Sequence, residues 1–254
     1  MSIALRHITL AYGQRILLRD VSASVPPGSL TALIGRNGTG KSTLLRTVAG
    51  LGAAASGGIE LCGKPLAALT PLQRASTVSF VTTDKVRIAN LACEDVVALG
   101  RAPLHQLDRT HAGDRPRHRG PFAPAGRHGG FRLQNDGPHV RRRMPAHPDR
   151  PCAGAGHPVI LLDEPTAFLD LPNRYELATL LRRLAHDEGK CILFSTHDLD
   201  VALGLCDAVA LIDTPDLHCL PASDMASSGH IERLFAGAGI SFDPATLTIR
   251  LTKK

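Results

Sequence analysis

Residues 35–42 read Gly35-Arg36-Asn37-Gly38-Thr39-Gly40-Lys41-Ser42. The apolar segment from Ser29 to Ile34 precedes this glycine loop and predicts a short strand, and the segment from Lys41 to Ala49 has the apolar spacing of a helix. This order is typical of a phosphate-binding loop, because residues without side chains let backbone N–H groups surround phosphate oxygens at a helix N-terminus. The sequence therefore predicts a nucleotide site here.

The side chains at the end of the loop complete the predicted site. Lys41 is placed to reach the phosphates, and Ser42, with Thr43 behind it, offers a hydroxyl to Mg²⁺. Because a pattern of eight residues also occurs by chance in unrelated proteins, the prediction needs support from the rest of the chain.

A second candidate site follows an apolar segment. Val159 to Leu162 predicts a buried strand, and this strand ends in two carboxylates, Asp163 and Glu164. The first carboxylate is placed to hold Mg²⁺ and the second to polarise an attacking water. A core strand with an ordinary acidic end is the alternative interpretation of these residues alone.

The pattern on both sides of these motifs alternates strands with helices. Such alternation predicts a mostly parallel sheet covered on both faces, in an α/β protein. The expected strands are 4–13, 15–25, 29–34, 59–61, 78–81, 159–162, 191–195 and 209–212, and the expected helices are 41–49, a short one from Thr70, 94–99, 174–185 and 199–205.

Two further strings give the motifs a family context: Pro165-Thr166-Ala167-Phe168-Leu169-Asp170 and Ser195-Thr196-His197-Asp198. Together with the loop and the acidic strand, they resemble the motifs of ATP-binding cassette (ABC) ATPases, over residues 1–103 and 158–254. The resemblance implies a P-loop NTPase core with an antiparallel β subdomain at the N-terminus. It also implies ATP and Mg²⁺ as bound ligands, in a single ATPase domain that spans residues 1–254.

The resemblance assigns roles to individual residues. Tyr12 matches the aromatic residue that stacks on adenine, and Asp170 is expected at the interface of an ATPase dimer. His197 matches the switch histidine that contacts the γ-phosphate, and it joins Lys41 and Glu164 as the expected catalytic groups. The other expected nucleotide-binding residues are Gly35, Arg36, Asn37, Gly38, Thr39, Gly40, Ser42 and Thr43.

The chain departs from the family pattern in two places. The family has a glutamine after the strand at 78–81, where it senses Mg²⁺ and contacts the membrane subunit; Thr83 lies near this position and joins Ser42 and Asp163 as an expected metal contact. The second departure is larger. The printed sequence lacks the signature motif that closes over ATP bound by the opposite subunit.

The missing signature coincides with a segment of unusual composition, residues 104–157. The segment holds ten Arg, eight Gly, seven Pro and seven His, but only six Leu, Val or Phe in total. Because it can bury little apolar surface, it is expected to be disordered and to replace the helical subdomain. Its charge is +6, so the other 200 residues sum to zero and the basic balance does not indicate a nucleic-acid partner.

A shift of one base in the reading frame restores the signature. The last two bases of each codon from His139 onward, joined to the first base of the next, permit M-S-G-G-E-C-Q-R-I-L-I-A up to Arg150. The same shift permits sensible joins after Pro103 and before Pro158. We therefore interpret residues 104–157 as a frameshifted segment, with an inserted base near codon 103 and a compensating loss near codon 157.

Composition bounds the cellular setting. The first 25 residues lack a cleavable leader pattern, and the chain has no apolar run of the roughly 20 residues that a membrane span needs. Six scattered cysteines without a C-x-x-C pair are typical of reduced thiols. We expect a peripheral protein on the cytoplasmic face of the inner membrane.

Within the family, two strings resemble the uptake group for iron-siderophore, haem and cobalamin: Leu99-Gly100-Arg101-Ala102-Pro103 and His230-Ile231-Glu232-Arg233-Leu234-Phe235. The resemblance implies the ATP-hydrolysing subunit of an importer, with ferric siderophore as the first choice of cargo. The implied partners are a second ATPase subunit, membrane permease subunits and an external substrate-binding protein. Two alternatives stay open: a soluble cassette ATPase outside transport, and a nucleotide-binding module without turnover.

Overall fold

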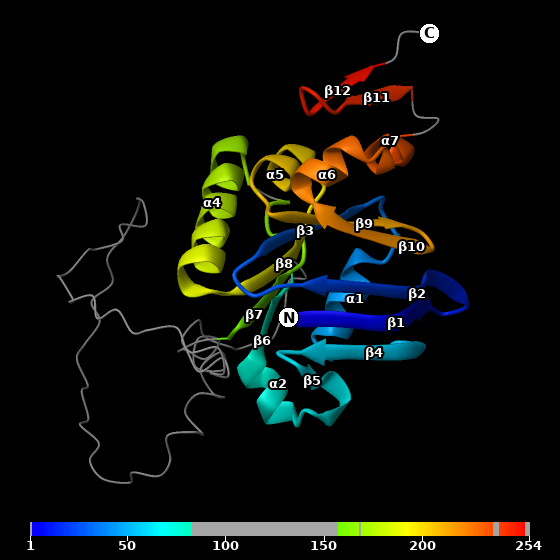
Figure 1. The fold of residues 1–254 in the computed structure, drawn as a ribbon, viewed down its shortest axis with the longest axis vertical. Coiled ribbons are helices and arrows are strands. Elements are labelled where there is room, and N and C mark those ends of the chain that lie inside the picture. Colours follow the sequence, from blue (N-terminus) through cyan, green and yellow to red (C-terminus); the bar gives the residue numbers. More distant parts are fainter. Residues whose placement is uncertain (1, 83–156, 168, 236–238, 252–254) are drawn as a thin grey trace, which may run out of the picture.

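The computed structural model describes residues 2–82, 157–167, 169–235 and 239–251, and these residues form an α/β fold with two main sheets (Figure 1). The larger sheet has the order β10-β9-β3-β8-β7-β6, and the smaller one has the order β2-β1-β4-β5. The fold class predicted from the sequence, a mostly parallel sheet with an N-terminal antiparallel sheet, is thereby confirmed. The expected helix at 94–99 and the segment 104–157, apart from His157, lie outside the described residues.

The larger sheet carries the glycine loop and the acidic strand. Its strands are β3 (Leu30–Gly35), β6 (Val78–Val81), β7 (Val159–Leu162), β8 (Cys191–Ser195), β9 (Ala208–Asp213) and β10 (Asp216–Pro221). All neighbouring pairs are parallel except β9 and β10. Because β3, β7 and β8 run in the same direction, their carboxyl ends meet at one edge, where ligands bind in open α/β sheets.

The smaller sheet is built from β1 (Ile3–Tyr12), β2 (Arg15–Val25), β4 (Ser56–Leu61) and β5 (Lys64–Pro65). All of its pairs are antiparallel, and Tyr12 lies opposite Arg15 at the hairpin that joins β1 to β2. This hairpin therefore places two consecutive strand ends side by side.

One helix lies between the sheets, and several cover the outer face of the larger sheet. The inner core joins α1 (Lys41–Val48) to both sheets, through Leu44 and Leu45 of the helix and Leu33 of β3. The outer core contains the alternate residues of β3, including Ala32 and Ile34. Figure 1 shows the helices of that face, α4 (Leu171–Glu188), α5 (Leu199–Gly204), α6 (Ala222–Ser227) and α7 (His230–Leu234).

Local capping sets the ends of the predicted helices. Thr70 caps α2 (Pro71–Thr77) in a reciprocal arrangement with Gln73, as the sequence suggests. Helix α4 begins earlier and ends later than the predicted 174–185, because Asp170 caps its first turn and Gly189 ends it in a left-handed conformation. The remaining elements are a 3₁₀ turn at Leu66–Ala68 and a terminal hairpin, β11 (Ile240–Asp243) with β12 (Thr248–Leu251). None of the helices in the described part of the chain is long and apolar enough to cross a membrane.

Candidate nucleotide site

The glycine loop connects β3 to α1 in a conformation that requires glycine at two positions. Gly40 immediately precedes α1 with a φ of 106°, and a Cβ at this residue would lie 2.9 Å from the Leu17 side chain. Gly35 ends β3 with a φ of 153°, and its Cβ would lie 2.9 Å from the backbone oxygen of Ile212. Any larger residue would therefore displace the neighbouring strand as well as the loop.

Lys41 is held by the backbone of its own loop. Its Nζ donates to the carbonyl oxygens of Gly35, at 3.0 Å, and Arg36, at 3.3 Å. The side chain is nearly buried, and this desolvation lowers the pKa of Lys41 despite the opposing attraction of Glu164 and Asp163. The ammonium is thus fixed above the loop with carbonyl oxygens as neutral partners, in the position from which it can reach a phosphate.

A buried serine organises the two carboxylates that follow β7. Ser195 Oγ, at the end of β8, donates to Asp163 Oδ1 at 2.7 Å and accepts from the backbone N–H of Glu164 at 2.8 Å. Ser195 is 0% exposed, and Glu164 has a φ of 50°, in the left-handed region that a non-glycine residue rarely adopts. The serine therefore fixes both the Asp163 carboxylate and the unusual backbone of Glu164.

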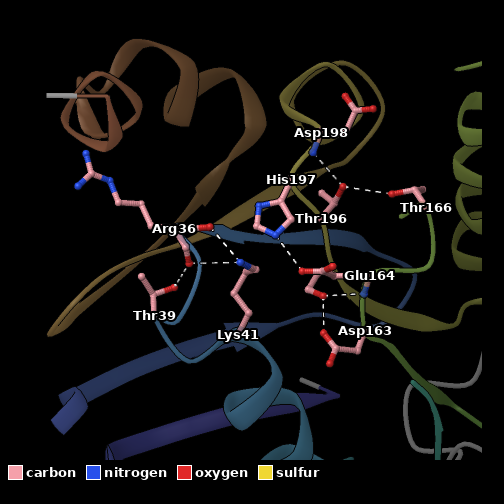
Figure 2. Close-up of polar contacts among 11 residues, drawn as sticks. Arg36, Thr39, Lys41, Asp163, Glu164, Thr166, Thr196, His197 and Asp198 are labelled. Atoms are coloured by element: carbon pink, nitrogen blue, oxygen red, sulfur yellow. Dashed lines mark hydrogen bonds and ion pairs between the residues drawn. The ribbon is translucent and has the colours of Figure 1, made fainter. Parts of the chain in front are cut away.

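His197 comes from the turn after β8 and faces the carboxylate of Glu164 (Figure 2). Its Nε2 lies 2.8 Å from Glu164 Oε1, in a partly exposed hydrogen bond. The neighbouring Thr196 Oγ1 accepts from the backbone N–H of Asp198 at 3.1 Å and lies 3.4 Å from Thr166 Oγ1. The turn that carries His197 is thus bonded to the segment that carries Glu164.

The loop and Glu164 border a common cavity of about 360 Å³. Tyr12 and Arg15 line it from the β1–β2 hairpin, and the Tyr12 side chain is 76% exposed. The other lining residues are Leu17, Asn37, Gly38, Gly40, Lys41, Ser42, Thr43 and Glu164. A second cavity of about 260 Å³ lies on the far side of Glu164 and is lined by Thr166, Ala167, Arg174, Thr196, His197 and Asp198.

The sequence-predicted residues fall into three groups. One group lines or borders the cavity: Tyr12, Asn37, Gly38, Gly40, Lys41, Ser42, Thr43 and Glu164. Gly35 and Arg36 contact Lys41 of that group, and His197 contacts Glu164. Thr39 and Asp163 are one step further away, since Thr39 bonds to Arg36 O and Asp163 accepts from Ser195. Asp170 lies apart, as the cap of α4, and Thr83 is outside the described residues.

Two residues at the site were not singled out from the sequence. Ser195 was quoted only as part of a motif, although a hydroxyl at the end of a fully apolar strand is a signal that it bonds something at the sheet edge. Arg15 is predicted only as the first residue of a strand. Its position beside Tyr12 follows from the tight hairpin between them.

The donor chemistry suits Mg²⁺ rather than a softer metal. Ser42 and Asp163 offer a hydroxyl and a carboxylate, which are the oxygen ligands that Mg²⁺ prefers. In the described residues no cluster of three or more His, Cys, Asp or Glu side chains could hold a metal by itself.

Comparisons with known proteins place the chain in a family. The sequence pattern described as "ABC transporter" matches residues 18–119. The hemin import ATP-binding protein HmuV of Bordetella pertussis is 34% identical over 243 residues, which cover 92% of each chain. The iron(3+)-hydroxamate import ATP-binding protein FhuC of Bacillus subtilis is 29% identical over 217 residues, which cover 79% of this chain and 75% of FhuC.

Solved structures agree with this placement at the level of the fold. An inward-facing metal-chelate type ABC transporter has a chain that superposes with a TM-score of 0.60 at 18% identity, over 92% of this chain and 88% of that one. The dimeric bacterial ABC transporter cassette MJ0796 gives a TM-score of 0.56 at 20% identity, over 83% and 94%. The chain belongs to the ABC transporter ATP-binding proteins, the subunits that couple ATP hydrolysis to transport.

Proposed function

We propose that this ATPase subunit drives the import of iron complexes through a membrane permease. The observation that carries the proposal is the likeness, over nine tenths of the chain, to a hemin import ATP-binding protein, together with the likeness to an iron(3+)-hydroxamate import protein. The proposed assembly has two ATPase subunits on the cytoplasmic face of the membrane, the permease and an external binding protein. One of the similar solved structures is itself a dimeric cassette.

The proposed chemistry places ATP in the cavity between the glycine loop and Glu164. Tyr12 stacks on the adenine, loop amides and Lys41 bind the phosphates, and Ser42 and Asp163 hold Mg²⁺. Bound Mg²⁺ would neutralise phosphate charge during the reaction. Glu164 orients the attacking water and accepts its proton, and His197 positions the Glu164 carboxylate at 2.8 Å.

A Glu164→Gln substitution tests this assignment. The amide cannot accept a proton from water, so we expect ATP binding to persist while hydrolysis stops. Asp187→Asn, an exposed acid-to-amide change on α4, is the matched control and should leave both unchanged. Hydrolysis at the parental rate in the Glu164 variant would show that another base is at work.

Two iron complexes are candidates for the transported compound. Ferric siderophore is the first choice within the uptake group that the sequence strings resemble, whereas hemin is favoured because several similar proteins carry the name hemin import ATP-binding protein. A deletion strain supplied with either compound as its only iron source distinguishes them. Loss of growth on one compound alone, restored by the gene, identifies the cargo; normal growth on both would contradict iron import.

We also propose that residues 104–157 arise from a shifted reading frame and that the native chain keeps the helical signature subdomain. Support comes from the charge surplus confined to this segment and from the signature that one shift recovers. Sequencing of the source DNA should show one base fewer near codon 103 and one more near codon 157. A peptide that contains Met144-Pro145-Ala146-His147 in the native protein would disprove the shift.

A further inference from the structure

Arg36 is a loop residue whose backbone and side chain lie in opposite directions: Figure 2 shows its backbone bonded near Lys41 and Thr39 and its guanidinium extended away from them. Its carbonyl oxygen accepts from Lys41 Nζ at 3.3 Å and from Thr39 Oγ1 at 2.8 Å, both within the loop. Its guanidinium points away from the cavity and donates to the carbonyl oxygen of Leu234, through Nε at 2.7 Å and Nη2 at 2.5 Å. The two residues are 198 positions apart in the sequence.

The partner of the guanidinium is the last residue of α7. The final carbonyls of a helix have no intrahelical donor and carry partial negative charge, so a cation at this end is favourable. Two N–H groups of one planar guanidinium on one carbonyl also fix direction better than a single flexible donor would. The contact thus joins the C-terminal end of α7 to the backbone of the phosphate loop.

Helix α7 is itself anchored, so the contact can transmit its position. Ile231 is 0% exposed in the outer core, and the ring of His230 stacks on His218 of β10 with centroids 3.7 Å apart. The backbone N–H of Phe235, just after the helix, donates to Glu232 O at 3.0 Å. A short helix with these contacts has a defined place against the sheet.

We propose that Arg36 is a positioning residue that couples α7 to nucleotide binding. The carbonyl of Arg36 accepts from Lys41 Nζ, so the position of the Arg36 backbone sets where this ammonium meets a phosphate. Docked α7 keeps the Arg36 backbone in the geometry that leaves the cavity open and the loop amides aligned. Since coupling is reciprocal, bound ATP must in turn strengthen the docking of α7.

Two measurements on the full chain test the coupling. We expect Arg36→Ala to weaken ATP binding about five- to tenfold in calorimetric titration, a typical coupling between two sites. In the parent, saturating ATP should slow amide hydrogen exchange at Phe235, and in Arg36→Ala this slowing should disappear. Arg36→Lys keeps the charge with a single donor group and should restore part of both effects. Arg233→Ala removes an exposed arginine from the same helix and should match the parent.

The outcomes separate this inference from the proposed function on which it rests. Failure of the parent itself to bind ATP would contradict the assignment of the nucleotide site. Weaker binding by Arg36→Ala, with the Phe235 exchange still slowed by ATP, would mean that the arginine touches the nucleotide directly and would overturn the coupling. Unchanged affinity in Arg36→Ala would overturn it as well. Urea unfolding of each variant shows whether the fold is intact.

Discussion

The two sides of the nucleotide cavity are held by different means. On the loop side, Lys41 and Thr39 both donate to the backbone carbonyl of Arg36, which lies five residues from Lys41 and three from Thr39. On the carboxylate side, Asp163 and Glu164 depend on Ser195 and His197, which come from the neighbouring strand β8 and the turn after it.

This difference predicts two kinds of sensitivity. The loop is set mainly by backbone conformation, so its geometry should survive the loss of side chains other than Arg36, while its chemistry depends on the Lys41 ammonium. The carboxylate side is set by side-chain hydrogen bonds between strands, so the loss of one hydroxyl should disturb both its geometry and the stability of the fold.

The largest effect is expected for Lys41→Met on the loop side. At an ATP concentration of 100 times the parental Kd, bound ATP stabilises the parent by about 2.7 kcal/mol, and the variant should gain nothing. Because burial lowers the pKa of Lys41, the ligand-free variant should be at least as stable as the parent. Thermal unfolding with and without ATP measures both, and exposed Lys64→Met is the control. A normal ATP shift in the Lys41 variant would contradict the role of the ammonium.

Ser195→Ala should destabilise the carboxylate side. The substitution leaves the Glu164 N–H and the Asp163 carboxylate without their buried partner, at a cost of about 1–3 kcal/mol in the free energy of unfolding. Urea unfolding measures this cost. Ser29→Ala is the matched control, because Ser29 is also buried but has only a long 3.3 Å contact to Thr31 Oγ1. Equal losses of stability in the two variants would show that the two Ser195 hydrogen bonds contribute no more than an ordinary buried hydroxyl does.

A smaller effect should distinguish glycine from alanine at Glu164. With a φ of 50°, alanine keeps the left-handed cost of roughly 1–2 kcal/mol that glycine avoids. After the greater chain entropy of glycine is subtracted, Glu164→Gly should be more stable than Glu164→Ala by about 0.5–1 kcal/mol. At exposed Glu176 in α4 the order should reverse, since alanine favours a helix. The same order at both positions would rule out backbone strain at Glu164.

The sequence predicted the parts of this site that are local. The strand, loop and helix around residues 35–42, the acidic end of β7 and the two strands on either side of Gly13 follow from spacing within a few residues. The Ser195 bridge and the Arg36 bond to Leu234 join residues 31 or more positions apart. Such contacts depend on strand order and helix packing, which the spacing of apolar residues does not specify. Strand β10, helix α6 and the terminal hairpin are short local elements that the predicted strands and helices do not include.

The smallest effect concerns pH and the helix that Arg36 contacts. Desolvation, with the nearby charges of His218 and Arg233, lowers the pKa of His230 from its usual 6.5, and Asp213 opposes this. As the pH falls below 6.5, the unfolded chain therefore takes up a proton before the folded chain does, and the free energy of unfolding decreases until the folded pKa is reached. His230→Phe keeps an aromatic ring on His218 but cannot titrate. As the pH is lowered from 7.5 to 5.5, its free energy of unfolding, measured in urea, should therefore increase relative to that of the parent. A constant difference over that range would show that His230 stays neutral in both states or is solvated in the fold. If α7 supports the loop, lowering the pH from 7.5 to 5.5 should also weaken ATP binding more in the parent than in this variant.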